Sequence, residues 1–556
     1  MNYRKSTNRN TLKQIMHYLR RDELPPETDF IILYSFLYKY CSDHTKSSLL
    51  FELKSKKISI SEAYRSGIFQ SEISLDLLKL NGFFIKKPEA FIEEVVNANY
   101  LKPGFLQEFL RVFPEFTIFN SEYHNMQYFD HLFKITDEII HRFKFDSQAN
   151  KNLCEIIYLI SKLNVMEDDL GFDEVFSILS SSRYISTESN PEYITQVLSE
   201  IILTEKKTVN SVYDPFMKDG KSITQLNDRL KNGLKYCYGK DVNELNFLYS
   251  MAKFFMKGFS FNNVFLKHED ALDSVDINGA SFDVIISRVP IAIKNYYSSN
   301  VKQNMEIAKR NKRSELENIL LNNFGMDGDS FKQDNELNQA LENLVEKIDF
   351  NDSAMEFKGQ YESLRDSEFL FLINLVEALN QDGIMAISIS ENFLFKDSLE
   401  ILRRYLTLEK NYIDAIIRIP NEFIRSRPEV VIVFRKDRSR EDILFIDMSS
   451  EYDTQKNAYT FPGLFRNSLV LDENTISKMR NVFLNRIAMP KYSNLISMDE
   501  IEDNDFNLSV SRYVDTFEGE FVSLEDLASQ KQDIDLNLRK LNLKIKKMMD
   551  ELDIRF

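Results

Sequence analysis

Apolar residues recur with two different periods along the chain, and the period changes near residue 205. Before that point they lie three and four residues apart, which predicts amphipathic helices. After it, short apolar runs alternate with helical stretches, as is typical of a parallel sheet whose strands are joined by helices. The pattern therefore predicts a helical region followed by an α/β region. The clearest helices of the first region span 11–20, 29–42, 105–113 and 127–143.

One of these helices contains an apolar run at 30–40 that carries hydrophobic side chains on nearly every side. This fits the interior of a helical bundle better than a membrane or cofactor role. In the α/β region we predict a doubly wound, mostly parallel sheet, in which ligands gather at the carboxyl ends of strands. A helix at 368–379 precedes the fifth strand. The predicted strands are 209–213, 235–240, 263–267, 282–286, 383–390, 413–418 and 429–435, with 442–447 as one more.

Two polar segments interrupt or follow the sheet. Residues 296–366 form an insertion rich in Asn, Lys and Glu, typical of a mobile loop or a substrate lid. Its basic run at 309–313 has two interpretations, solvated surface or phosphate contact, and we favour the first. We divide the chain into a helical domain at 1–200, an α/β domain at 201–500 and a C-terminal helical segment at 501–556 that contacts a partner. The last segment carries a coiled-coil-like heptad seam at Leu524, Leu527, Ile534, Leu538, Leu541, Ile545, Met548 and Leu552.

A single apolar seam on an otherwise polar helix needs another helix to cover it. That helix could belong to the same chain or to another subunit, and periodicity does not distinguish the two. Lys531 is the one residue that interrupts the seam.

Composition and charge limit the partners and the cellular compartment that we expect for the protein. The formal net charge of the 556 residues is −16, so any contact with DNA needs a local basic patch or a basic partner. The three cysteines have neither metal-binding spacing nor a disulfide framework, which suits a reducing cytoplasm. No apolar run is long enough to span a bilayer, and the first residues lack a signal core. We expect a cytoplasmic protein without a metal or a membrane segment.

Candidate ligand-binding residues lie where predicted strands end. Asp214 closes the first strand, and Gly220 would permit close backbone approach in the turn that follows. Asp241 follows the second strand and could accept hydrogen bonds from a ribose, and Asp270 follows the third and could contact an adenine amino group. Each aspartate alone is more often a turn or helix cap. Their succession in βα order is more specific than any one of them.

At these positions the chain resembles the methylation (M) subunit of type I restriction–modification systems, in the adenine-specific (N6) DNA methylase family. The resemblance covers nearly the whole length. It implies a Rossmann-like, S-adenosylmethionine-dependent methyltransferase domain after an N-terminal helical domain. The matching segments are 16–20 and 36–43 in the helical opening, Asp214-Pro215 with Gly220 in the cofactor loop, 239–242 and Asp270 at the next strand ends, 413–420, 429–436 and 443–447 in the closing strands, and 504–508 with 511–515 before the C-terminal helices.

The resemblance also implies ligands and partners. The cofactor is S-adenosylmethionine, with Asp214, Pro215, Gly220, Asp241 and Asp270 in contact with it. The partners are DNA and a specificity (S) subunit, with room for a restriction (R) subunit and for a second M-like subunit.

Departures from the family pattern fall on the catalytic segment. Where the family has Asn or Asp, then Pro-Pro and an aromatic residue, this chain has Arg288-Val289-Pro290-Ile291. In the family an amide oxygen accepts hydrogens of the adenine amino group while an aromatic ring stacks on the flipped base. Arginine has donors only, and Ile291 has no ring.

The cofactor loop departs as well. Lys218 replaces a family glycine, and Phe216-Met217 replaces small residues, so that side chains would crowd the cofactor.

These departures leave several functions open. The first is an M-like subunit whose methyl transfer is impaired by the altered segment. The second is a fully active adenine-specific DNA methyltransferase, in which a shift in register brings Ser287 or Asn295 to the base. The third is a non-catalytic scaffold or regulatory protein on DNA. A bland fourth is an α/β domain with an unrelated ligand. We expect methyl transfer to be absent.

Overall fold

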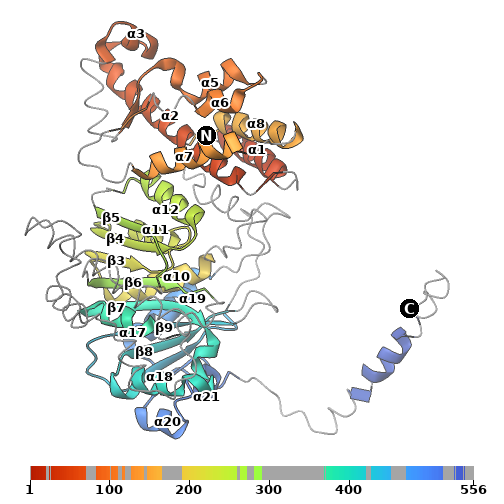
Figure 1. The fold of residues 1–556 in the computed structure, drawn as a ribbon. Helices are drawn as coiled ribbons and strands as arrows, with labels where there is room; N and C mark the ends of the chain where they lie inside the picture. The colour runs from red at the N-terminus through yellow and green to blue at the C-terminus, as the bar shows by residue number, and fades with distance from the viewer. Residues whose placement is uncertain are drawn as a thin grey trace, which may run out of the picture.

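The fold is that of a computed structural model. It describes residues 2–19, 24–25, 27–69, 83–100, 102–110, 116–118, 127–142, 147–165, 191–259, 263–271, 281–290, 369, 371–420, 428–451, 471–516 and 531–544 apart from 533 and 543. A helical region precedes a large sheet covered by helices on both faces (Figure 1). Among the described residues, no helix is long and apolar enough to cross a membrane. The predicted insertion at 296–366 lies outside the described residues.

The N-terminal region is built around one long helix. Helix α2 contains the apolar run at 30–40, and Ile31, Leu33, Tyr34 and Leu37 within it are buried, which confirms the predicted bundle helix. A small antiparallel pair, β1 with β2, was not predicted because each strand has only three residues. The elements are α1 (Asn2–Leu19), α2 (Thr28–Lys56), α3 (Ile60–Arg65), β1 (Phe83–Ile85), α5 (Ile92–Asn99), α6 (Phe105–Leu110), β2 (Phe116–Ile118), α7 (Gln127–Arg142) and α8 (Ser147–Lys162).

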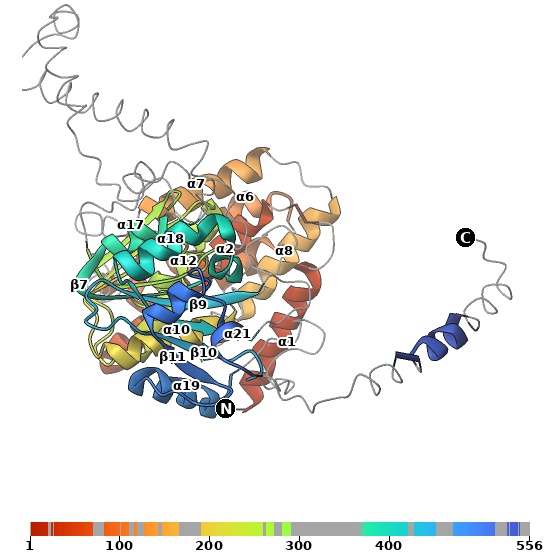
Figure 2. The ribbon, with the colours of Figure 1, turned by 90° about the horizontal axis from the view of Figure 1, so that it is seen from below.

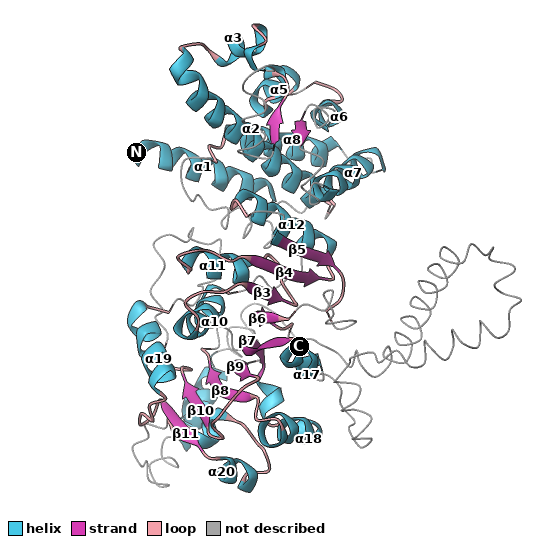
Figure 3. Cartoon of the chain, turned by 90° about the vertical axis from the view of Figure 1, so that its left-hand side faces the viewer, coloured by secondary structure: helices cyan, strands magenta, loops and turns pink. Residues whose placement is uncertain are grey.

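Nine strands of the described residues form one sheet, in the order β11-β10-β8-β9-β7-β6-β3-β4-β5 (Figure 3). Five neighbouring strands, β5, β4, β3, β6 and β7, are mutually parallel. Strand β9 runs antiparallel between β7 and β8, and β11 runs antiparallel to β10. The predicted mostly parallel sheet is confirmed. The strands are β3 (Ser211–Asp214), β4 (Tyr236–Asp241), β5 (Val264–His268), β6 (Phe282–Arg288), β7 (Leu379–Ser390), β8 (Ile413–Arg418), β9 (Glu429–Arg435), β10 (Ile443–Asp447) and β11 (Ser493–Ile496).

Alternate side chains of the strands enter two separate cores, as the pleat requires. Val284 and Ile286 of β6 face one core, and Ile285 faces the other. Helices cover both faces, so the sheet is doubly wound (Figure 2). The first core is covered by α10 (Glu192–Glu205), α11 (Lys221–Arg229), α12 (Glu244–Met256) and α19 (Glu473–Asn485). The second is covered by α17 (Phe371–Glu377), α18 (Glu400–Arg404), α20 (Met498–Asp503) and α21 (Val510–Tyr513).

Helix α12 connects the sheet to the helical region. The ring of Phe255 lies 5.7 Å from that of Tyr40 and 5.3 Å from that of Phe83. The apolar core on this face of the sheet continues into the helical region, because both sets of side chains belong to one cluster.

At the amino-terminal ends of the central strands, one carboxylate joins three neighbouring strands through hydrogen bonds. Asp283, the second residue of β6, accepts hydrogen bonds from the backbone of Asn210 and Ser211 at the start of β3 and from the side chain of Asn380 on β7. This fixes the register of the three central strands. The positions of the opposite, carboxyl ends of these strands, where the candidate site lies, are therefore fixed relative to one another.

The C-terminal residues that are described, 531–532, 534–542 and 544, are helical, as the heptad pattern predicts. Seam residues Ile534, Leu538 and Leu541 are 52–60 % exposed. The other predicted seam positions lie outside the described residues. Figure 1 shows this helix apart from the sheet.

Candidate functional site

The candidate site is formed at the carboxyl ends of the central parallel strands. Asp214 is the last residue of β3, Asp241 the last of β4 and Arg288 the last of β6. Because β4, β3 and β6 are neighbours in the sheet, these three side chains start from one edge. Asp270 lies in the loop after β5 and is half-buried. The predicted placement of these residues at strand ends is confirmed, whereas their contact with a ligand stays a prediction.

Asp214 is fully buried. Its Oδ1 accepts hydrogen bonds from the Ser287 hydroxyl at 2.5 Å and from the backbone N–H of Phe216 at 3.1 Å. Its Oδ2 has no hydrogen-bond partner among the described residues. Burial raises the pKa of this carboxyl to about 7, although the hydrogen bonds oppose the rise. Asp214 is therefore a titratable group enclosed beneath the loop that follows β3.

Asp241 is almost as buried, but both of its carboxylate oxygens are already engaged. Oδ2 accepts from the backbone N–H of Lys218 at 2.8 Å. Oδ1 accepts from the backbone N–H of Asn243 at 2.8 Å and from the Asn246 amide at 3.2 Å. Burial raises the pKa of the Asp241 carboxyl against the effect of these bonds. The oxygens predicted to bind a ribose are therefore occupied by donors of the chain itself.

The loop between β3 and α11 has an unusual backbone. Lys218 has φ +49°, in the left-handed region that favours glycine. Its carbonyl accepts a hydrogen bond of 2.6 Å from the Ser250 hydroxyl on α12. Only 8 % of Lys218 is exposed. The backbone N–H and the carbonyl of this strained residue are therefore both hydrogen-bonded, to Asp241 and Ser250.

Two other loop residues pack closely against neighbouring elements. Met217 is fully buried beside Gly239, where an added Cβ would lie 2.7 Å from the Met217 Sδ. Gly220 has φ +69°, and an added Cβ there would lie 2.7 Å from the Phe254 ring. The close approach at Gly220 is therefore to helix α12 of the chain itself. Pro215 is buried in the same turn.

Arg288 forms a buried ion pair across the neighbouring strand. Its Nε donates to Glu429 Oε2 at 2.9 Å and its Nη2 to Glu429 Oε1 at 2.6 Å, a bidentate arrangement. The Ser388 hydroxyl donates to Oε2 at 2.8 Å. Only 6 % and 8 % of the Arg288 and Glu429 side chains are exposed. The guanidinium is therefore directed into the protein at the position where the family signature has an amide.

The remaining residues of this segment are only partly described. The N–H of Val289 donates to the carbonyl of Ser388 at 2.9 Å, so the segment continues along β7 for one residue past β6. Val289 is buried and Pro290 half-buried. Ile291 and Asn295 lie outside the described residues.

Glu429 and Ser388 were not identified from the sequence. The sequence places a single carboxylate at the start of the apolar strand 429–435. A buried carboxylate needs a partner of opposite charge, and a buried arginine elsewhere could supply it. The pairing required knowing that β9 runs antiparallel, which brings its first residue to the edge where β6 ends.

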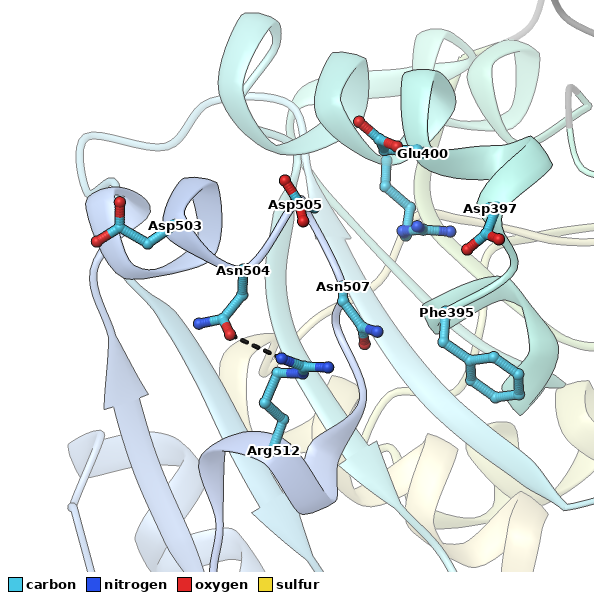
Figure 4. A pocket seen from close by; sticks show the side chains of 9 residues that line it. Phe395, Asp397, Glu400, Asp503, Asn504, Asp505, Asn507 and Arg512 are labelled. Carbon is cyan, nitrogen blue, oxygen red and sulfur yellow. Dashed lines mark hydrogen bonds between the residues drawn. The ribbon is translucent and has the colours of Figure 1, made fainter.

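A hollow of about 250 Å³ shares no residue with this site. It contains the Arg512 guanidinium, bonded to Asn504, between two segments of the second core (Figure 4). Buried Arg403 donates only to backbone carbonyls there, which indicates a structural clamp. Its lining residues are Phe395, Asp397, Glu400, Arg403, Asp503, Asn504, Asp505, Asn507 and Arg512. In the described part of the chain, no group of three His, Cys, Asp or Glu side chains is placed to hold a metal ion.

Comparison with known proteins identifies relatives of this fold. The family model described as N-6 DNA Methylase matches residues 189–324 and 316–520. The type I restriction enzyme MpnII methylase subunit of Mycoplasma pneumoniae is 22% identical over 66% of this chain and 60% of its own length. The type I restriction enzyme MjaVII methylase subunit of Methanocaldococcus jannaschii is 22% identical over 65% of this chain and 54% of its own length. The chain thus spans just over half the length of these curated relatives.

A solved structure has the same fold over most of the chain. It is a type I restriction-modification system methyltransferase subunit from Streptococcus thermophilus, with TM-score 0.63 and 19% sequence identity. The match covers 92% of this chain and 100% of that chain, so the helical region and the sheet are both included.

Proposed function

The chain belongs to the N-6 DNA methylase family, and on that premise we propose that it acts as the methylation subunit of a type I restriction–modification system, with its own methyl transfer to adenine impaired. The observation that carries the impairment is the buried ion pair of Arg288 with Glu429. The subunit assignment is supported by the names of the relatives and by the fold shared with the Streptococcus thermophilus protein.

Hydrogen-bond polarity explains the impairment. The exocyclic amino group of adenine is a poor nucleophile because its lone pair is delocalised into the ring. A base turned out of the duplex needs acceptors for the hydrogens of that group. Arg288 supplies only donors, and its Nε and Nη2 are directed at Glu429, so it presents no acceptor to that group. Glu429 does not serve as a substitute acceptor, because its oxygens are engaged by Arg288 and Ser388.

Binding to DNA is proposed to depend on partners. The net charge of −16 repels a polyanion, and we therefore assign most of the DNA affinity to a specificity subunit. A restriction subunit and a second M-like subunit complete the proposed assembly.

The test of impaired transfer measures incorporation of labelled methyl groups from S-adenosylmethionine into adenine. We expect the unmodified chain to give none above background, with several specificity subunits and mixed DNA pools. Incorporation by the unmodified chain that Asp214→Ala abolishes would overturn the proposal in favour of an active methyltransferase.

Restoring the family residues is the matched comparison. The variant combines Arg288→Asn, Val289→Pro, Ile291→Phe and Lys218→Gly with Glu429→Gln, because Glu429 would otherwise remain as a buried unpaired carboxylate. We expect incorporation to reappear in this variant and not in Arg288→Asn alone. A silent combined variant in a folded assembly would indicate that other positions also block transfer.

The C-terminal helix is the proposed contact with the specificity subunit. Ile534, Leu538 and Leu541 follow the three-and-four spacing of a coiled-coil seam and are more than half exposed. Such a seam is stable only when another helix covers it.

Deletion of residues 523–556 is expected to abolish co-purification with the specificity subunit, because the seam is removed. The substitution set Ile534→Glu, Leu538→Glu and Leu541→Glu should act the same way. Lys540→Glu, a substitution of another exposed residue of the same helix, is the control and should leave association unchanged. Full association of the deleted chain would contradict this assignment.

A further inference from the structure

We propose that Lys218 closes the cofactor site from within, so that the unmodified chain does not bind S-adenosylmethionine. The proposal rests on the proposed function in one respect, namely that it takes the ends of β3 and β4 as the family's cofactor site. It goes beyond the proposed function because it concerns binding of the cofactor, whereas the proposed function concerns the methyl-transfer step.

The backbone of Lys218 fixes the loop beside the candidate site. Its N–H uses Asp241 Oδ2 at 2.8 Å, and its carbonyl is held by Ser250 at 2.6 Å. The other Asp241 oxygen accepts from Asn243 and Asn246. The two bonds made by Lys218 involve only its backbone atoms, so they hold the loop against β4 and α12 and would persist in a variant that changes the side chain.

The charge of Lys218 also opposes the charge of the cofactor. Asp214 and Asp241 are 0 % and 7 % exposed, and buried carboxylates need a nearby cation or a proton. Burial raises the pKa of both carboxyls, and the charge of Lys218 lowers the pKa of each without outweighing burial. S-adenosylmethionine carries a positive sulfonium, so in this site it would meet a lysine of the same charge.

Space is the third argument. Lys218 is 8 % exposed, and the neighbouring Met217 is completely buried against Gly239 of β4. In the family these two positions carry a glycine and a small residue. Both added side chains lie inside the protein, so the volume between the loop and β4 is taken by the chain. The residues present therefore do not fit the cofactor.

The left-handed backbone explains why one substitution should reopen the site. Lysine at φ +49° is strained, whereas glycine adopts this conformation without penalty. Lys218→Gly therefore keeps the loop geometry while removing both the ammonium and the side-chain bulk. Lys218→Asn is a second variant, because asparagine tolerates the left-handed region and is shorter and uncharged.

The experiment is calorimetric titration of the full-length chain with S-adenosylmethionine and, separately, with S-adenosylhomocysteine. We expect no measurable binding to the unmodified chain, and at least tenfold tighter binding to Lys218→Gly or Lys218→Asn. Lys218→Arg, which keeps charge and length, should remain unable to bind. Lys221→Met, three residues further along at the start of α11, is the control and should behave like the unmodified chain. Thermal unfolding without ligand establishes that each variant is folded.

Binding of S-adenosylmethionine by the unmodified chain would overturn the inference, and so would folded Lys218→Gly and Lys218→Asn variants that both fail to bind. Equal binding by Lys218→Arg and Lys218→Gly would overturn it too. Failure of the proposed function is read separately, from co-purification with a specificity subunit in the same preparations. If the unmodified chain binds the cofactor and co-purifies with the specificity subunit, only the closure by Lys218 is contradicted. If it does not bind the cofactor and does not co-purify, only the subunit assignment is contradicted.

Discussion

Replacing Arg288 by methionine is expected to lower the free energy of unfolding by about 3–5 kcal/mol, because it leaves the buried Glu429 carboxylate without its cation. The pair is bidentate and nearly fully buried, so solvent cannot compensate for the loss. Ser388 would remain as a single hydroxyl donor to Glu429. Urea unfolding followed by circular dichroism measures the change.

A double-mutant cycle separates the ion pair from simple loss of packing. Arg288→Met with Glu429→Leu should recover most of the loss, because removing both charges avoids an unpaired buried group. Lys257→Met provides the matched control, since the ion pair of Lys257 with Asp228 is exposed and is expected to contribute only about 0–1 kcal/mol. If Arg288→Met and Lys257→Met cost the same, the ion pair does not stabilise the strand ends.

Replacing Asp214 by asparagine is expected to make the protein progressively more stable than the unmodified chain as the pH rises from 4 to 8. Burial raises the pKa of Asp214 from 3.8 to about 7. Below 3.8 the carboxyl is protonated in both states. Between 3.8 and about 7 it ionises only in the unfolded state, so the folded state loses relative stability as the pH rises. Above about 7 the penalty is complete, and at about 1.4 kcal/mol per pKa unit it amounts to about 4 kcal/mol.

The measurement compares the free energy of unfolding of Asp214→Asn and of the unmodified chain at steps of pH between 4.5 and 8. Carboxyls distant from Asp214 are present in both proteins and cancel in the difference, whereas the charge of Asp241 contributes to the raised pKa of Asp214. Ser287→Ala tests the cause independently, because the Ser287 hydrogen bond lowers the pKa of Asp214. Its loss should shift the inflection to higher pH. Parallel stability curves for Asp214→Asn and the unmodified chain would refute the raised pKa.

The strands could be predicted because their apolar runs are continuous. The bounds of β8 and β9 coincide with the predicted 413–418 and 429–435. Strand β7 begins at Leu379, four residues before its predicted start, because Leu379 pairs with Phe282 ahead of an irregularity, after which the pairing resumes at Ile384. Strand β11 was missed, since Ser493 and Asn494 give it no apolar alternation.

The site was only partly accessible to sequence reasoning. Asp214, Asp241 and Arg288 could be placed because strand ends follow from apolar runs. The replacement of a glycine by Lys218 was recognised as crowding. Its left-handed backbone and its bond to Asp241 depend on the three-dimensional path of the loop, which no periodicity contains.

The antiparallel direction of β9 couples two distant positions of the chain. An antiparallel strand delivers its first residue, Glu429, to the edge where β6 delivers its last, Arg288, although 141 positions separate them in the chain. Neither residue can be exchanged alone without stranding a charge inside the protein. Replacing Arg288 by the family's amide would therefore leave a buried carboxylate at Glu429 unless a second substitution, 141 positions away, accompanies it.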